Sequence, residues 1–105
     1  MAGMYCMRDL LGLLLREGAT ELRLCSGSSP VFVARGTPLA IDAPSVTSDE
    51  LETLLGSIAT EEQREELQKC GDVHFIYVLH HSARFSVLAA RFGETLSVAI
   101  KNLER

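Results

Sequence analysis

The sequence lacks a long hydrophobic run. Its longest nearly unbroken apolar stretch extends from Leu10 to Leu15 and is interrupted by Gly12. A helix that crosses a bilayer needs about 20 predominantly apolar residues, so no segment of the sequence is expected to span a membrane. The stretch is also too short for a secretory signal peptide, and no small-residue cleavage site follows it. These absences predict a cytoplasmic protein.

Positive charge is also scarce. Ten Lys and Arg residues face 14 Asp and Glu residues, which gives a formal net charge of −4 at pH 7. Proteins that bind nucleic acids neutralise phosphates with clustered Lys and Arg. No run of basic residues is present, although Arg84 and Arg91 fall in one segment and could share a surface. We therefore expect no nucleic-acid partner.

The cysteines and histidines show no metal-site spacing. Cys6, Cys25 and Cys70 are odd in number and form no CxxC motif, so they are predicted to be free thiols of the core. His80 and His81 are adjacent on a predicted strand and would therefore point to opposite faces. No carboxylate or cysteine lies at ligand spacing from them, so no metal site is expected.

Catalytic motifs are missing as well. Residues 27–30 lack the lysine of a phosphate-binding loop and lead into a strand, and no GxSxG or HExxH motif occurs. His74 could form a hydrogen-bonded pair with Asp72, but a catalytic dyad also needs a nucleophile. Ser86 and Cys25 qualify only by residue type. We expect no catalytic residues, no cofactor and no enzymatic activity.

Hydrophobic periodicity predicts the order of the elements. Apolar residues recur at helical spacing in three segments and alternate, as in strands, in six others. The expected helices cover residues 4–17, 51–58 and 61–70, and the expected strands cover residues 20–25, 31–35, 39–41, 73–80, 83–91 and 96–100.

The sequence also predicts where two of the helices begin and where one of them ends. Thr47 with Glu50, and Thr60 with Gln63, have the spacing of capping boxes, and Gly71 can end the helix in which Leu67 and Cys70 are expected to face inward.

This order predicts the fold class. An α-βββ-αα-βββ chain of 105 residues, with no repeat or linker, is expected to form one α+β domain over residues 1–105. Its single antiparallel sheet would carry the helices on one side. The strand at residues 73–80 is apolar on both faces and is therefore expected to be central.

An ordered series of segments resembles the N-terminal, PAS-like domain of PilT-type ATPases, the motors of type IV pilus retraction. The similarity covers residues 10–103, nearly the whole chain. The matching segments are EGATELRL (17–24) with QGASDLHL, SGSSP (26–30) with AGLPP, VFVARG (31–36) with MIRVDG, EQREEL (62–67) with KQRKDFEE, DVHF (72–75) with DFSF, ARFSV (83–87) with ARFRVN, and KNL (101–103) with FRTIP.

The resemblance implies a domain that precedes a RecA-like core in a hexameric motor, with basic residues that approach nucleotide bound by the adjacent core. Arg84 matches such a position, whereas Lys101 replaces an arginine and Ser86 replaces another. Losing a guanidinium removes bidentate phosphate recognition. Glu21 and Arg23 stand where the family has Asp and His. These departures favour a freestanding domain over a fragment of a motor.

Together, these observations predict a non-catalytic module that works by protein–protein contact or self-association, with pilus or polarity proteins as partners. The segments 31–35 and 96–100 are candidate sheet edges for that contact. The candidate polar contacts are Arg84, Arg91, Lys101, Glu21 and Arg23.

Two alternatives remain open at this point. A small-ligand sensor would use a cavity between sheet and helices, lined by Leu22, Leu24, Phe75 and Phe85. A truncated N-terminal part of a motor ATPase would continue into a phosphate-binding loop.

Overall fold

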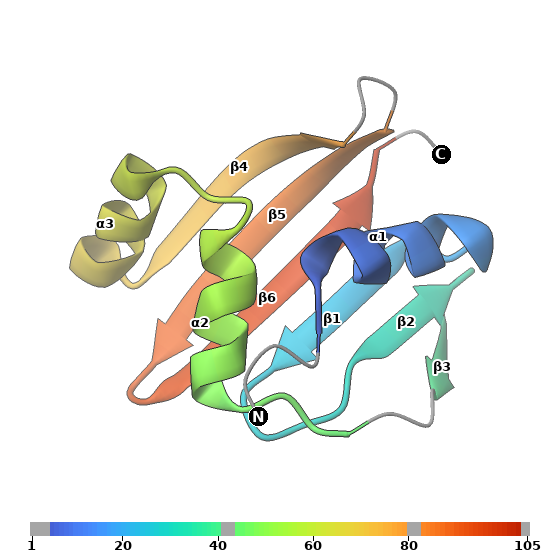
Figure 1. Cartoon of the computed structure of the whole chain (residues 1–105), viewed down its shortest axis with the longest axis horizontal. Helices are drawn as coiled ribbons and strands as arrows, with labels where there is room; N and C mark the ends of the chain where they lie inside the picture. The colour runs from blue at the N-terminus through green and yellow to red at the C-terminus, as the bar shows by residue number, and fades with distance from the viewer. Residues whose placement is uncertain (1–4, 41–43, 80–82, 104–105) are drawn as a thin grey trace.

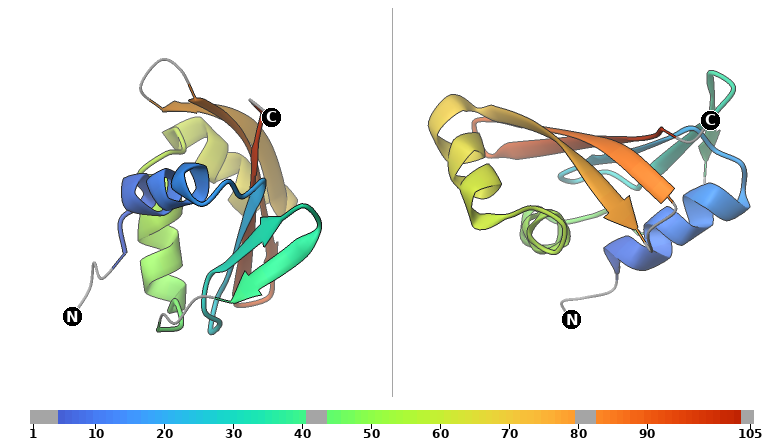
Figure 2. Two further views of the ribbon diagram at one scale, coloured as in Figure 1. Left: turned by 90° about the vertical axis from the view of Figure 1, so that its right-hand side faces the viewer. Right: turned by 90° about the horizontal axis from the view of Figure 1, so that it is seen from above.

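A computed structural model describes residues 5–40, 44–79 and 83–103. Within these residues, six strands form one antiparallel sheet, and three helices cover one of its faces (Figures 1 and 2). The predicted α+β class and element order are confirmed. The elements are α1 (Met7–Arg16), β1 (Glu21–Cys25), β2 (Val31–Ala34), β3 (Thr37–Ala40), α2 (Ser48–Gly56), α3 (Glu61–Cys70), β4 (Asp72–Leu79), β5 (Ala83–Phe92) and β6 (Thr95–Asn102).

Local hydrogen bonds define the ends of α2 and α3. The Glu50 backbone N–H donates to Thr47 Oγ1 at 3.1 Å, and the Thr47 N–H donates to Glu50 Oε1 at 3.0 Å. Thr60 and Gln63 make the same reciprocal pair. Both predicted capping boxes are confirmed, and each satisfies two backbone donors that a helix start leaves unpaired. Gly71, at a φ of 88°, ends α3 in the left-handed conformation.

The strand order is β3-β2-β1-β6-β5-β4, so the outer strands are β3 and β4. The two predicted edge segments, 31–35 and 96–100, are wrong, because they form β2 and the inner strand β6. The cause is the antiparallel pairing of β1 with β6, with Leu22 opposite Ile100, which joins the two halves of the sheet. Sequence alternation sets which face a side chain occupies but not which strand is its neighbour.

The prediction that residues 73–80 form a central strand is also wrong, because β4 is an edge strand. Its inward residues Val73, Phe75 and Leu79 are buried under the helices. Ile76 and Val78 point the other way, and each is 50% exposed. The two-sided apolar pattern of β4 therefore reflects an uncovered apolar surface rather than burial on both faces.

One apolar core lies between the sheet and the helices. Leu22, Leu24 and Phe85 are at most 1% exposed and pack against the apolar face of α1 and α2. The thiols are not part of this core: Cys6 and Cys70 are exposed and Cys25 is half-buried, so their predicted burial is wrong. In α3 the buried side chain is Leu67, while Cys70 lies in the last, exposed turn.

The β2–β3 hairpin turns on two residues of positive φ. Ala34 pairs with Thr37, which leaves Arg35 at a φ of 54° and Gly36 at 78° in the loop. Positive φ at both loop residues defines a type I′ turn, whose twist matches that of the flanking strands. Glycine adopts this conformation freely, whereas an arginine side chain there costs free energy.

We predict that Arg35→Asn raises the free energy of unfolding by about 0.5–1 kcal/mol, because asparagine tolerates the left-handed conformation better than arginine. Gly36→Ala is the matched control and should lower it by about 1 kcal/mol. Urea unfolding followed by circular dichroism measures both. An Arg35→Asn variant less stable than the wild type would contradict this account of the turn.

Candidate interaction surface on the open face of the sheet

None of the three helices in the described part of the chain covers the second face of the sheet, which we call the open face (Figure 2). Strand register arranges its side chains in rows that cross the strands. One row runs from Ile76 on β4 through Ser86 and Lys101 to Glu21 on β1. The next row contains His74, Leu88, Ala99 and Arg23.

Four large apolar side chains are exposed on the part of the open face that β4, β5 and the end of β6 form. Ile76 and Val78 are each 50% exposed, Leu88 on β5 is 49% exposed and Leu103 is 46% exposed. The Leu103 backbone N–H donates to the Arg84 carbonyl at 2.9 Å, which continues the β5–β6 register past the end of β6. These four side chains, Ile76, Val78, Leu88 and Leu103, form what we call the apolar cluster.

The open face is charged beside this cluster. Arg23 Nε lies 3.0 Å from Glu21 Oε2, and Lys101 is the cross-strand neighbour of Glu21. Arg84 lies between two members of the cluster, opposite Val78 on β4 and next to Leu103. Of the five predicted contact residues, the structure thus gathers Glu21, Arg23, Arg84 and Lys101 on one face.

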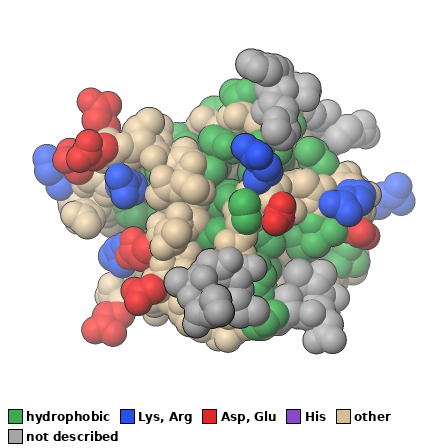
Figure 3. All heavy atoms as spheres, viewed as in Figure 1, with side chains coloured by type: hydrophobic (Ala, Val, Ile, Leu, Met, Phe, Trp, Pro, Cys, Tyr) green, Lys and Arg blue, Asp and Glu red, His purple; other side chains and the backbone are tan. Residues whose placement is uncertain are grey.

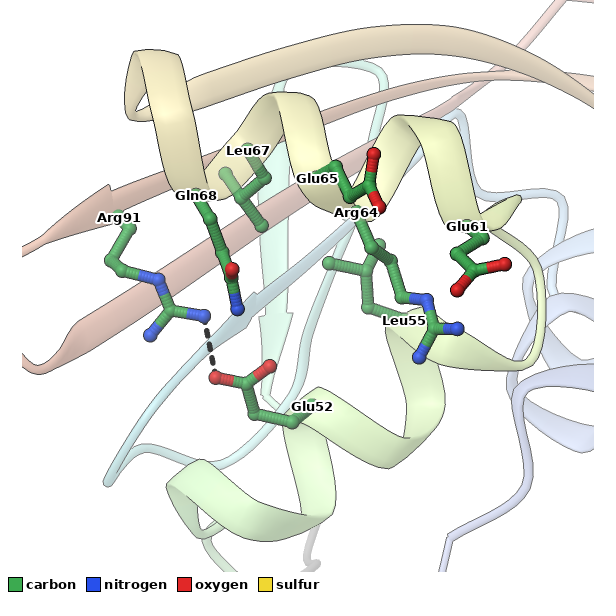
Figure 4. Close-up of a pocket in the computed structure, with 8 residues that line it drawn as sticks. All are labelled: Glu52, Leu55, Glu61, Arg64, Glu65, Leu67, Gln68 and Arg91. Carbon is green, nitrogen blue, oxygen red and sulfur yellow. Dashed lines mark hydrogen bonds and ion pairs between the residues drawn. The ribbon is translucent and has the colours of Figure 1, made fainter.

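Arg91, the fifth predicted residue, points to the helix side. It pairs with inward-facing Leu96, and its Nη2 lies 2.5 Å from Glu52 Oε2 on α2. This ion pair closes one end of a hollow of about 240 Å³ between α2, α3 and β5, which Arg64 enters from α3 (Figure 4). Charged side chains of both signs also crowd this part of the helix side in Figure 3. Arg91 therefore does not share a surface with Arg84.

A second hollow of about 460 Å³ lies between the start of α1 and the end of α2, with Tyr5 and Tyr77 in its lining. The Tyr5 hydroxyl donates to the Pro44 carbonyl. The pKa of the Tyr5 phenol is raised, mainly by burial and to a smaller extent by the negative charge of Glu50.

The residues expected to line a sensor cavity do not line either hollow, because their side chains fill the core: Leu22, Leu24, Phe75 and Phe85.

His74 does contact a nucleophile-type side chain. Its Nε2 lies 2.6 Å from Ser86 Oγ on the exposed open face. Asp72 shares that face but makes no hydrogen bond to His74 in the described part of the chain. A catalytic serine needs an oriented base and a site for the reacting group. Neither Ser86 nor His74 lines the two hollows described above, so the contact is a surface hydrogen bond.

Within residues 5–40, 44–79 and 83–103, no group of three or more His, Cys, Asp or Glu side chains is placed to hold a metal ion. None of the helices in these ranges is long and apolar enough to cross a bilayer. His80 and His81 lie outside the described residues.

Sequence reasoning missed the apolar cluster. The signal was present in the alternation of β4, where Ile76 and Val78 share the face of polar His74. Once strand order is known, that mixture of polar and apolar side chains indicates a solvent-facing surface. Without the order, the same residues are compatible with a buried central strand.

We predict a small coupling between Arg91 and Glu52. A double-mutant cycle of Arg91→Ala and Glu52→Gln, followed by urea unfolding, should give about 0.3–1 kcal/mol, because the Glu52 side chain is 48% exposed and solvent screens the pair. The coupling should shrink in 1 M salt. A coupling that is unchanged by salt would contradict an ordinary surface ion pair.

Comparisons with known proteins give matches in structure alone. No family model matches the sequence, and no curated protein matches it. The pilus retraction motor PilT with bound ADP matches 92% of this chain with a TM-score of 0.83 at 20% identity. The ATPase DotB matches 97% of it with a TM-score of 0.79 at 16% identity for the Legionella pneumophila protein, and 91% with a TM-score of 0.69 at 14% identity for the Yersinia pseudotuberculosis protein.

The chain spans only part of these proteins: 29% of the PilT chain and 30% and 29% of the two DotB chains. At these identities the similarity concerns the fold. The resemblance predicted from the ordered segments is thereby confirmed, and the chain has the fold of the N-terminal domain of PilT-type ATPases.

Proposed function

We propose that this chain is a non-catalytic protein-interaction and oligomerisation module, related to the N-terminal domain of PilT-type ATPases. The observation that carries the proposal is the apolar cluster on the open face. Its four large side chains are each about half exposed on one face: Ile76 and Val78 are successive outward residues of β4, Leu88 lies diagonally from Ile76 on β5, and Leu103 lies beyond Arg84 at the end of β6. Contiguous exposed apolar surface rimmed by polar residues marks interaction sites in soluble proteins.

The apolar cluster can supply only part of the free energy of binding a partner. Full burial of a Leu or Ile side chain is worth about 1.5–3 kcal/mol, so covering the exposed half of each gives about 1 kcal/mol. Four such side chains supply about 4 kcal/mol, whereas association costs at least about 4 kcal/mol in lost freedom. A partner must therefore also engage backbone groups or the charged residues beside the cluster.

The charged residues supply orientation. Glu21 and Arg23 form a pair, and Lys101 adds a cation next to that carboxylate. Such groups steer encounter and fix register more than they add affinity. Pilus or polarity proteins, or further copies of the chain, are the partners we propose, with a cytoplasmic location and a role in pilus-based twitching motility.

The non-catalytic part of the proposal rests on what the residues offer to a nucleotide. Arg84 alone keeps the arginine of the related motors, while Ser86 and Lys101 replace two others. Without a phosphate-binding loop, Arg84 on an open face cannot hold a triphosphate in place for attack by water.

We predict that the purified chain releases no phosphate from ATP above the buffer rate, in a colorimetric assay with Mg²⁺. Because contaminating ATPases are common, the control is Arg84→Ala prepared identically. Turnover by the wild type that Arg84→Ala abolishes would contradict a non-catalytic role.

The interaction surface can be tested by photo-crosslinking in the native cells. A benzophenone amino acid in place of Leu88 should give covalent protein adducts, because Leu88 is 49% exposed in the apolar cluster. The matched control carries the same probe in place of Glu66, an exposed residue of α3. Mass spectrometry then identifies the captured protein. Equal or fewer adducts from position 88 than from position 66 would refute the open face as the interaction surface.

A further inference from the structure

The outer edge of β4 faces no other strand of the described residues. The Arg91 N–H donates to the Gly71 carbonyl at 2.8 Å, so Gly71 and Arg91 form a hydrogen-bonded pair in the β4–β5 register. In an antiparallel ladder such pairs alternate along the strand. The odd-numbered residues of β4 therefore bond to β5, and the even-numbered ones direct their N–H and C=O groups outward: Asp72, His74, Ile76 and Val78.

Nothing in the β4 sequence protects this edge. Residues 72–79 contain no proline, lysine or glycine, and the register with β5 runs without a bulge from Asp72–Ala90 to Leu79–Ala83. Proline, lysine and bulges are the usual devices that keep edge strands from pairing with another chain. Seen from above, β4 crosses in front of the other strands, and α3 lies beside its first residues (Figure 2).

The opposite edge is protected. Strand β3 has four residues and contains Pro38. Ala34 and Thr37 close the two-residue turn as a hydrogen-bonded pair, so Val33 and Pro38, one step along, form a non-hydrogen-bonded pair. The Pro38 nitrogen therefore faces outward and has no N–H to offer there. The two edges of the sheet differ in length and chemistry, and β4 is the one able to pair.

We propose that two copies of this chain pair through their β4 edges, antiparallel about a two-fold axis, to form one continuous twelve-stranded sheet. This inference rests on the proposed function and names its partner as a second copy. Asp72 lies opposite Val78 of the second copy, and His74 lies opposite Ile76 of the second copy. The axis passes between the two Phe75 residues.

In this register, every outward backbone N–H and C=O group of Asp72–Leu79 makes a hydrogen bond to the second copy. Each of its four pairs, two and their symmetry equivalents, exchanges two hydrogen bonds, so every even-numbered residue of β4 is paired. A shift by two residues in one direction would leave Asp72 without a partner inside the strand, and a shift in the other direction would leave Val78 without one. Pairing also keeps side chains on their own faces, because even-numbered residues meet even-numbered residues.

The side chains and charges of β4 are compatible with this register. On the open face, Ile76 of one copy lies opposite His74 and diagonally across from Ile76 of the second copy, so the two apolar clusters meet at Ile76, while Val78 lies opposite Asp72. No like charges are opposed across the pairing, since the two Asp72 residues lie at opposite ends. The acidic α3 helices, which lead into β4, are likewise separated, and each chain's net charge of −4 makes salt favour association.

Sedimentation over a range of protein concentrations tests the dimer. The wild-type chain should associate reversibly to twice its mass. Ile76→Pro removes an outward N–H without breaking a β4–β5 bond and should raise the dimer dissociation constant at least about tenfold. Ile76→Lys is a second variant with the same expected effect, in case proline disturbs folding. Leu39→Lys, at the protected edge, is the matched control and should leave the constant unchanged.

Disulfide trapping tests the register. In a background with Cys6, Cys25 and Cys70 replaced by Ser, His74→Cys chains mixed with Ile76→Cys chains should crosslink on oxidation, because facing Cα atoms in a hydrogen-bonded pair lie within disulfide range. Either variant alone is offset by two residues and should crosslink at least about tenfold more slowly. Faster crosslinking of Ile76→Cys alone would overturn this register.

The outcomes also separate this inference from the proposed function. A wild-type chain that stays monomeric, while the probe at position 88 captures a different protein, overturns the β4 dimer and leaves the interaction role standing. Loss of that heterologous capture in Ile76→Pro would show that the edge takes another chain's strand instead of a second copy. A dimer unaffected by both Ile76 variants would overturn edge pairing.

Discussion

The arrangement of the molecule depends on the backbone pairing of β1 with β6. This ladder, from Glu21–Lys101 to Cys25–Ser97, holds the strands of the first half of the chain against those of the second. Leu22, Leu24, Val98 and Ile100 lie on its inner side and are at most 1% exposed, so the same pairing lies at the centre of the core. Because it places β1 and β6 inside the sheet, it also leaves β3 and β4 as the edges.

That pairing creates the candidate surface. Glu21 and Arg23 come from β1 and Lys101 from β6, residues far apart in the sequence that the ladder brings into neighbouring rows. The apolar cluster forms the other side of the same face. An antiparallel sheet can leave one face to solvent, and here that face combines exposed apolar side chains with charge instead of being uniformly polar.

Local rules predicted much of the fold. Both capping boxes and the stop at Gly71 depend on residues within a few positions of each other, and all three were confirmed. Helical and strand periodicities gave the order of the elements, and the burial of Leu22 and Leu24 followed from alternation alone. Four of the five candidate contact residues proved to share one face, which alternation and an ordered resemblance to known segments made predictable.

Features that depend on contacts between distant parts of the chain could not be predicted from the sequence. The edge positions were wrong because strand adjacency depends on which backbones meet, and side-chain pattern carries no record of that. Arg91 lies one residue past Ala90, which is on the open face, and this single step turns its guanidinium toward Glu52. Cys70 follows helical spacing, yet α3 touches the core only over a narrow stripe around Leu67. Each of these errors arises where tertiary context overrides a local preference.

The β1–β6 ladder also has a kinetic consequence. Its paired residues are separated in the chain by between 72 residues, from Cys25 to Ser97, and 80 residues, from Glu21 to Lys101. The β2–β3, β4–β5 and β5–β6 hairpins join strands that follow directly in the chain, so their loops close at small entropic cost. The central ladder instead must close a loop of about three quarters of the polypeptide. Folding is therefore expected to be limited by the meeting of two preformed halves, at the slow rate typical of topologies rich in distant contacts.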